Sequence, residues 1–300
     1  ELRTALADHL DVDICNIVVG EGIDGLLGYT ARMVVQEGDN IITSDGAYPT
    51  FNYHVIGYGG ILHKVPYKND HEDLDGLLQA VINTDAKLVY FANPDNPMGT
   101  VHSSEAVQNF IDRLPGNCLL ALDEAYIEFA PVGISPRIDV EQSNVLRFRT
   151  FSKGYGMAGA RVGYAIGSQD VILQFEKIRN HFGMNLAAQV GALAALHDQN
   201  WIEHIRHQVK NARDQISQIA HDNGLSIIPS ATNFVAIDCG HDSTFAKLVL
   251  LYLVEHGIFV RMPFVTPQDR CIRVSVGLEK DLRLLADLLP KALSEARSAS

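Results

Sequence analysis

The strongest constraint on the fold is an alternation of apolar runs with helical segments through the first two thirds of the sequence. The runs occupy residues 16–20, 40–43, 60–65, 87–92, 118–123, 144–149 and 161–166. Between the first two runs, apolar side chains recur at helical spacing over residues 22–36, as at Ile23, Leu26 and Met33. Strands that are apolar along their whole length are buried on both faces. The pattern therefore predicts an α/β fold, with a mostly parallel sheet flanked by helices.

The pattern changes after residue 185. Helices are expected at 186–197, 201–221, 243–256 and 279–296, with strands at 225–228, 233–237, 257–260 and 271–275. A chain of 300 residues is also at the size where one hydrophobic core usually divides into two. We therefore expect a large domain over residues 1–198 and a smaller C-terminal α+β domain over residues 199–300.

Charge and cysteine usage exclude several classes of partner and site. The sequence has 24 Lys and Arg against 36 Asp and Glu, a formal net charge of −12. Nucleic acids and anionic membranes bind clustered cations, so neither is expected as a partner. No apolar stretch has the length of a membrane span, and the sequence shows no signal peptide. The scattered cysteines and histidines lack metal-ligand spacing, so we expect reduced thiols, no metal site and a cytoplasmic protein.

Polar residues gather at the ends of the apolar runs, where an open α/β sheet binds its ligands. Lys153 follows one such run, among hydroxyl and glycine residues, which is an unusual setting for a solvated lysine. Burial near cations lowers the pKa of an ammonium group, and an imine-forming lysine needs a lowered pKa. Thr150 and Ser152 offer hydroxyl groups to a phosphate, and Arg161 offers a bidentate cationic contact. Lys153 is therefore the candidate nucleophile.

A glycine-rich loop allows a second interpretation. Residues 20–25 read Gly-Glu-Gly-Ile-Asp-Gly, which is formally GxGxxG between a strand and a helix, and Asp45 ends the next strand. Taken alone, this pattern also fits a nicotinamide dinucleotide site. The free backbone N–H groups at a helix N-terminus bind phosphate in either case. The loop therefore predicts a phosphate site without identifying its ligand.

Three motifs occur in one order and resemble those of a known family. They are Asn93-Pro-Asp-Asn96-Pro-Met-Gly99, Asp123-Glu-Ala-Tyr126-Ile-Glu-Phe129, and Ser152-Lys153 followed by Arg161. From its first residue to about residue 290, the sequence resembles the fold-type I aminotransferases that use pyridoxal 5′-phosphate (PLP). By pattern it is most similar to the histidinol-phosphate aminotransferases. A nicotinamide enzyme has no need for these residues in this order, whereas PLP chemistry uses all of them.

The resemblance implies roles around the cofactor ring. Lys153 is expected to carry PLP as a Schiff base and then to act as the catalytic base. Asp123 is expected to keep the pyridine nitrogen protonated, which strengthens the ring as an electron sink; on the residues alone it would be read as a helix N-cap. Asn96 and Tyr126 are expected on the phenolic oxygen of PLP, and Tyr48 is expected to stack on the ring.

The resemblance also implies contacts for the anionic groups. The expected ligands of the PLP phosphate are the main-chain amides of Glu21, Gly22 and Ile23, with the side chains of Thr150, Ser152 and Arg161. Arg273 is expected to bind the substrate α-carboxylate, and Arg261 a substrate phosphate. On the residues alone, Arg273 could equally be an outward-facing strand residue.

The implied activity is ping-pong transamination. The amino substrate would be histidinol phosphate or an aromatic amino acid, and the acceptor a 2-oxo acid such as 2-oxoglutarate. A PLP-dependent decarboxylase of the same family is one alternative. A PLP-sensing regulator domain is another, against which the acidic composition and the complete catalytic set count. The resemblance further implies a homodimer with small-molecule substrates, and an N-terminal arm that relatives carry before the position of Glu1 and that is absent from this sequence.

Overall fold

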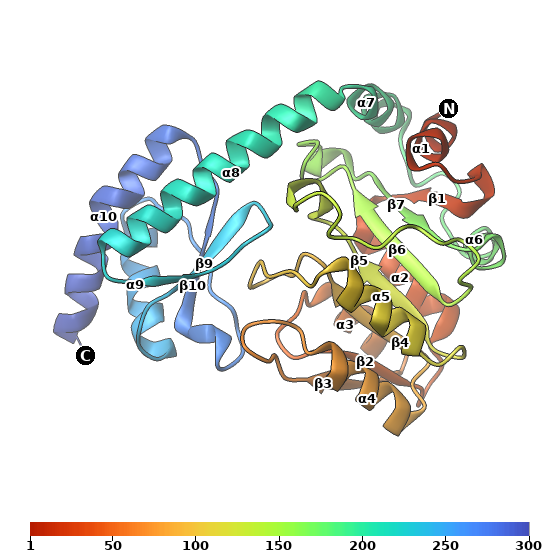
Figure 1. Ribbon diagram of the computed structural model, residues 1–300, viewed down its shortest axis with the longest axis horizontal. Helices are drawn as coiled ribbons and strands as arrows, with labels where there is room; N and C mark the ends of the chain where they lie inside the picture. The colour runs from red at the N-terminus through yellow and green to blue at the C-terminus, as the bar shows by residue number, and fades with distance from the viewer. Residues whose placement is uncertain (300) are drawn as a thin grey trace.

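A seven-stranded sheet forms the larger part of the fold in the computed structural model, which describes residues 1–299 (Figure 1). Its strands are β1 (Ile17–Gly20), β2 (Asn40–Ser44), β3 (Ile61–Val65), β4 (Leu88–Ala92), β5 (Leu119–Asp123), β6 (Val145–Thr150) and β7 (Gly163–Ile166). Their spatial order is β1-β7-β6-β5-β4-β2-β3. Strand β7 runs antiparallel to both of its neighbours, and the pairs from β6 to β3 are parallel. The predicted mostly parallel sheet is confirmed.

Helices cover both faces of this sheet, as the doubly apolar strands require. On one face lie α2 (Gly22–Val34), α3 (Thr50–Gly57) and α6 (Gln169–Phe175), where Phe51 packs against β4 and β6 side chains such as Phe148. On the other face lie α4 (Leu74–Thr84) and α5 (Ser104–Arg113), which bury Leu77 and Phe110. The predicted α/β class, with helices flanking the sheet, is therefore confirmed.

Two helices cover the β1 end of the sheet. They are α1 (Leu2–Leu10) and α7 (Leu186–His197), which pack together around Leu6, Phe151 and Ala192 (Figure 1). Phe151 follows β6 directly, so this cluster also anchors the turn that carries Lys153. Short 3-10 turns complete this part of the chain: η1 (Ile14–Asn16), η2 (Ile127–Phe129) and η3 (Ala158–Ala160).

A three-stranded antiparallel sheet forms the C-terminal part of the fold. Its order is β10 (Cys271–Ser275), β9 (Phe234–Asp238), β8 (Ser226–Ile228), and its helices are α8 (Gln199–Asp222), α9 (Ser243–Glu255) and α10 (Glu279–Ala299). Side chains from all three helices and from β9 and β10 form a separate apolar cluster. Helix α8 runs from this cluster back toward α7, so it spans both parts of the molecule (Figure 1). We propose that the two domains divide at residue 198, where Asp198 caps α8 by accepting a hydrogen bond from the Trp201 N–H.

The strand predicted at residues 257–260 is wrong. Gly257 has a φ of +88° and forms a turn after α9, and only Arg261 pairs with β10, through a single bridge to Arg273. A left-handed backbone at Gly257 ends the regular structure, which the apolar run that follows could not reveal. The turn η4 (Gln268–Arg270) then leads into β10. Within residues 1–299, no helix combines the length and the apolar character needed to cross a membrane.

Candidate active site

The sequence-predicted residues meet in a pocket at the carboxyl ends of β4, β5 and β6. Its volume is about 150 Å³, and it is lined by Ile23, Asp24, Tyr48, Tyr90, Ala92, Asn96, Asp123, Ala125, Tyr126, Thr150, Ser152, Lys153, Ala158 and Arg161. Parallel strands bring their carboxyl ends to one edge of the sheet, so residues far apart in sequence become neighbours there. Nine of the predicted residues line this pocket, and the other four (Glu21, Gly22, Arg261 and Arg273) lie outside its lining.

Lys153 enters the pocket from the turn after β6. Its Nζ lies 5.2 Å from the centre of the Tyr126 ring. The turn is tight, because a Cβ on Gly154 would come within 2.8 Å of the Glu128 Cβ. Burial lowers the pKa of Lys153, and although the Asp123 carboxylate opposes this shift, the net direction is downward. A lowered pKa enriches the neutral amine, which is the form that attacks a carbonyl group.

Asp123 ends β5 and lies at one wall of the pocket, only 5% exposed. The Tyr90 hydroxyl donates to its Oδ2 at 2.9 Å, and the Ala125 N–H donates to its Oδ1 at 2.9 Å. Burial raises the pKa of Asp123 to about 6, against the lowering effect of these two hydrogen bonds. A carboxylate buried in this way is stabilised by a cationic partner, and a protonated pyridine nitrogen fits that requirement.

Arg161 and the start of α2 form the other end of the pocket. Arg161 Nη1 donates to the Ala158 carbonyl at 3.0 Å and to Ser152 Oγ at 3.4 Å. A Cβ at Gly22 would lie 2.4 Å from Arg161 Nη2, and Gly22 has a φ of +84°, so glycine is required at this position. Backbone N–H groups of a helix N-terminus, hydroxyl groups and a guanidinium group suit a phosphate.

The side chain of Glu21 points away from the cofactor pocket. It accepts a hydrogen bond from the Tyr29 hydroxyl at 3.4 Å and lines a different hollow, beside α1 and α7. Its predicted contact runs through the main-chain N–H and stays a prediction. Asp45, the residue that would bind a ribose in a nicotinamide enzyme, lies 3.5 Å from Lys64 and outside the pocket lining. The geometry of Asp45 therefore does not support the nicotinamide interpretation.

Two aromatic residues, Tyr48 and Tyr126, also line the pocket. The Tyr48 hydroxyl donates to Asp24 Oδ1 at 3.1 Å. Tyr126 is 7% exposed and its ring packs edge-on against Phe234 of β9, with 5.5 Å between ring centres. Burial raises the pKa of Tyr126, so its hydroxyl stays protonated and can donate a hydrogen bond. The second sheet therefore closes one side of the pocket.

Arg273 lies on β10 beside the pocket and contacts one of its lining residues. Its Nη1 donates to Asn96 Oδ1, and its guanidinium carbon lies 4.8 Å from the centre of the Phe234 ring. Arg273 Nε is buried and has no hydrogen-bond partner among the described residues. Burial lowers the pKa of Arg273, and the neighbouring Arg261 adds to that effect. A half-buried arginine with a buried, unpaired Nε is poised to bind an anion.

Arg261 is exposed and pairs directly with Arg273 in an isolated antiparallel bridge. The two main chains exchange hydrogen bonds of 3.1 and 2.6 Å. The guanidinium carbon of Arg261 lies 5.2 Å from the centre of the exposed Phe259 ring. Residues that pair directly across antiparallel chains lie on the same face, so the two arginines form a cationic pair, of which Arg273 contacts Asn96 in the pocket lining.

Sequence reasoning missed two residues of the site. Asp24 lies in the first turn of α2, where a carboxylate is favoured by the helix dipole, and it contacts Tyr48 and lies 3.8 Å from Arg161. Its position within the glycine-rich loop was a usable signal. Tyr90 lies in the middle of β4 and carries no motif, so nothing in the sequence pointed to its contact with Asp123.

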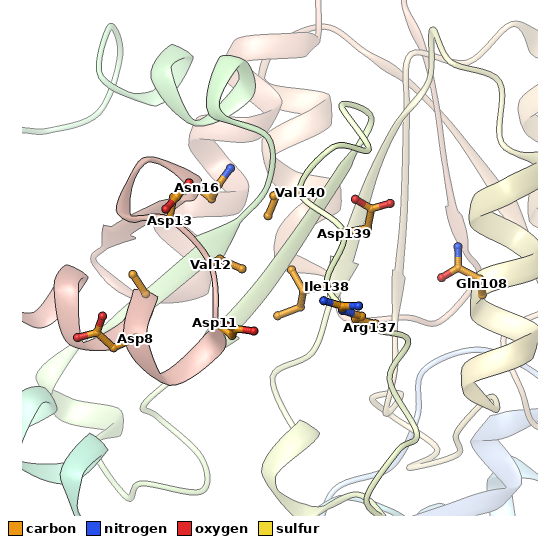
Figure 2. Close-up of a pocket in the computed structure, with 11 residues that line it drawn as sticks. Asp8, Asp11, Val12, Asp13, Asn16, Gln108, Arg137, Ile138, Asp139 and Val140 are labelled. Carbon is orange, nitrogen blue, oxygen red and sulfur yellow. The ribbon is translucent and has the colours of Figure 1, made fainter.

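A larger hollow lies away from this site. It measures about 920 Å³ and is lined by α1, the turn that follows it, and the segment before β6. Figure 2 shows Asp8, Asp11, Asp13 and Asp139 around it, with Arg137 among them. None of the predicted site residues lines it. Within the described residues no group of His, Cys, Asp and Glu side chains is arranged to hold a metal ion.

Comparison with known proteins supports the chemistry of the first pocket. The family described as "Aminotransferase class I and II" matches residues 1–289. The chain is 34% identical over 296 residues to a protein from Bacillus velezensis named histidinol-phosphate aminotransferase, covering 96% of this chain and 81% of that one. It is 35% identical over 297 residues to histidinol-phosphate aminotransferase 1 of Psychrobacter arcticus, covering 98% of this chain and 78% of that one.

A solved structure is more similar still. It is the histidinol-phosphate aminotransferase of Sinorhizobium meliloti in complex with pyridoxal 5′-phosphate. The two chains are 50% identical with a TM-score of 0.97, over 100% of this chain and 82% of the other. The pocket described above fits the same cofactor, because it brings together a lysine, a buried carboxylate and an arginine beside two hydroxyl residues. The chain belongs to the class I and II aminotransferases, enzymes that transfer amino groups with pyridoxal 5′-phosphate as their cofactor.

Proposed function

We propose that this aminotransferase exchanges an amino group between histidinol phosphate and a 2-oxo acid such as 2-oxoglutarate. The observation that carries the proposal is the cationic pair of Arg273 and Arg261 beside the pocket, with a buried free donor on Arg273. Histidinol phosphate presents a phosphate and no α-carboxylate, and 2-oxoglutarate presents carboxylates. An arginine pair at one place can bind the anion of each substrate in turn. The names of the similar proteins support this choice.

The residues around the cofactor ring have separable roles in this proposal. Lys153 supplies the amine that attaches PLP. Asp123 pairs with the pyridine nitrogen and keeps it protonated. Asn96 and Tyr126 donate hydrogen bonds to the phenolic oxygen, and Tyr48 contacts the ring. The positions of these residues in the pocket lining support the assignment.

The phosphate of PLP is assigned to the Arg161 end of the pocket. Its proposed ligands are the main-chain amides of Glu21, Gly22 and Ile23 and the side chains of Thr150, Ser152 and Arg161. The close approach of Gly22 to Arg161 supports the placement of these groups together. Thr150 Oγ1 accepts a hydrogen bond from the Ser152 N–H at 3.0 Å, which fixes the hydroxyl-bearing turn.

Proton transfer is assigned to Lys153. When bound, PLP withdraws electrons from the Cα of the amino substrate attached to it. The freed amine of Lys153 takes the proton from that Cα, and its lowered pKa favours the neutral form that can do so. Arg273 holds the substrate anion and so fixes the direction in which the Cα–H bond points. Tyr126 and Phe234 narrow the pocket and exclude water from its ring end.

A homodimer is proposed as the working form. Phe182, Leu186 and Val190 are 95%, 75% and 57% exposed, and Leu186 and Val190 share one face of α7. An exposed apolar group of this kind is typical of a protein interface. We also place the enzyme in the cytoplasm, which the four unpaired cysteines support.

Steady-state kinetics test the substrate assignment. The assay compares histidinol phosphate with histidinol and with phenylalanine as amino donors, each with 2-oxoglutarate. We expect kcat/KM for histidinol phosphate to exceed that for phenylalanine, and Arg261→Ala to lower only the former by about tenfold or more. The matched control is Arg283→Ala, an exposed arginine of α10. Equal losses of kcat/KM for both donors would contradict the phosphate role of Arg261. A preference for phenylalanine would show that the amino donor is an aromatic amino acid and not histidinol phosphate.

A further inference from the structure

Two carboxyl groups are buried behind the cofactor pocket and have no part in the roles assigned above. Glu72 lies between β3 and α4 and is 1% exposed, and Asp95 lies in the loop after β4 and is 2% exposed. Buried acids are costly to the fold unless their oxygens are fully paired. Both side chains are therefore expected to have defined partners, and the structure shows them.

Glu72 joins the ends of two strands that have separated. Strands β2 and β4 pair only at Ile41–Leu88 and Ile42–Val89. Beyond that point, Glu72 Oε1 accepts from the Ala92 N–H at 2.8 Å, and Glu72 Oε2 contacts Ser44 Oγ at 2.5 Å. The carboxyl group therefore accepts the Ala92 N–H, which a longer strand pairing would have used, and links it to the Ser44 hydroxyl of β2.

Asp95 holds the loop that follows β4. Its Oδ1 accepts from the Tyr67 hydroxyl at 2.7 Å, and its Oδ2 accepts from the Met98 N–H at 2.9 Å. The charge of Asp95 also acts on Glu72, so the two carboxyl groups are neighbours. Two neighbouring buried carboxylates repel each other, which favours the protonated form of one of them.

The acid pair connects directly to the active site. The loop of residues 93–99 carries Asn96, which lines the pocket and binds Arg273. Asp95 is the residue before Asn96, and Ala92, which Glu72 binds, also lines the pocket. Asn93, at the start of the loop, donates its N–H to the Asp123 carbonyl at 2.9 Å. A displacement of Glu72 would therefore move Ala92 and the loop that begins at Asn93. That loop carries Asn96 and is hydrogen-bonded to Asp123.

We propose that Glu72 is a positioning residue of the active site, which fixes the loop that carries Asn96 through its hydrogen bond to the Ala92 N–H. The proposal rests on the cofactor site assigned above and is independent of which amino donor is used. Its effect on the reaction is exerted through Asn96 and Arg273, so Glu72 itself touches neither cofactor nor substrate.

The surroundings of the pair set the sign of its pH dependence. Burial raises the pKa of Glu72 well above its ordinary value, and the charge of Asp95 raises it further. Burial also raises the pKa of Asp95 to about 6. The titratable groups that face the pair are Tyr67, His71, Tyr90 and Asp123, and His102 Nε2 is bonded to the Glu72 carbonyl at 2.8 Å. Both pKa values are raised, so folding stability is lost as pH rises through the folded-state values.

The test uses the PLP-bound enzyme and the variants Glu72→Gln and Glu72→Ala. Thermal unfolding is followed from about pH 6, the pKa of Asp95, to about pH 9, because the pKa of Glu72 is raised well above its ordinary value. The wild-type Tm is expected to fall with pH, and Glu72→Gln, which keeps the hydrogen bonds but cannot ionise, is expected to flatten that fall. Glu105→Gln, an exposed acid of α5, serves as the control and should follow the wild type.

The positioning role is tested by the KM for the amino donor. We expect Glu72→Ala to raise KM by about tenfold or more, because a shifted Asn96 loosens Arg273, and Glu72→Gln to restore it to within about threefold of wild type. A Glu72→Gln profile of Tm against pH that runs parallel to the wild type would overturn the raised pKa of the Glu72 carboxyl in the folded enzyme. An unchanged KM in Glu72→Ala would overturn the positioning role. Neither outcome depends on the identity of the donor, so failure here is distinguishable from failure of the substrate assignment.

Discussion

Replacing Tyr90 with Phe tests how the protein keeps Asp123 ionised. Tyr90 is fully buried, its ring stacks on Phe51 with 4.8 Å between ring centres, and its hydroxyl donates to Asp123 Oδ2. Phe preserves the ring and its stacking and removes only the hydroxyl. The second hydrogen bond to Asp123, from the Ala125 N–H, remains in the variant.

The size of the effect follows from the strength of the lost hydrogen bond. A hydrogen bond to a charged group contributes about 1.5–3 kcal/mol. Because 1.36 kcal/mol corresponds to one pKa unit, the pKa of Asp123 should rise by about one to two units. Starting from a pKa of about 6, Asp123 would shift to about 7 or 8. At pH 7 the ionised fraction would then fall from about 90% to between about 50% and about 10%.

The assay is PLP affinity as a function of pH. We expect Tyr90→Phe to bind PLP about two- to tenfold more weakly than wild type at pH 7. At pH 9, where Asp123 is ionised in both the variant and the wild type, the two affinities should be nearly equal. Tyr252→Phe, on α9 and far from the pocket, is the matched control. A loss of affinity that is the same at both pH values would refute the reasoning. It would mean that the Tyr90 hydroxyl maintains the shape of the pocket and does not affect the ionisation of Asp123.

Two further substitutions test ion pairs that hold the fold around the site. Arg270 binds Asp70 beside the seven-stranded sheet and Asp238 of β9, at 2.9 and 2.8 Å, so Arg270→Gln should lower the free energy of unfolding by about 1–3 kcal/mol, as measured by urea denaturation. A difference that vanished at low salt would contradict this ionic origin. Glu124 is fully buried against Arg149 at 2.8 Å, and the nearby arginines lower its pKa although burial alone would raise it. Glu124→Gln should cost about 3–5 kcal/mol near neutral pH and less in acid, where the wild-type carboxyl is itself protonated; a cost independent of pH would refute this assignment.

Much of the fold could be predicted because burial determines where apolar residues occur in the sequence. Strands covered on both faces read as continuous apolar runs, and polar residues at their ends, such as Asp123 and Lys153, stand out against them. The same argument failed at residues 257–260, where an apolar run follows a left-handed glycine and forms no strand. An apolar run indicates that its residues are buried, but it does not reveal the backbone conformation of the residue before it.

The partners of the site residues were beyond sequence reasoning. Tyr90 and Glu72 lie outside every motif, and each contacts a residue brought near only when the strands assemble. Arg273 was expected to bind a substrate anion, but its contact with Asn96 depends on how the second sheet docks against the first. Local patterns therefore identify the groups that carry charge or react, and the tertiary fold decides which groups position them.

The central claim is that Lys153 attaches the cofactor, and an absorbance spectrum tests it most directly. The purified protein is mixed with PLP and compared with Lys153→Ala under the same conditions. We expect the wild type to show the band of lysine-linked PLP, and borohydride to reduce it to a covalent adduct, whereas Lys153→Ala should show the spectrum of the free aldehyde. A wild type that binds PLP with a free-aldehyde spectrum, or a Lys153→Ala variant that keeps the lysine-linked band, would contradict the account.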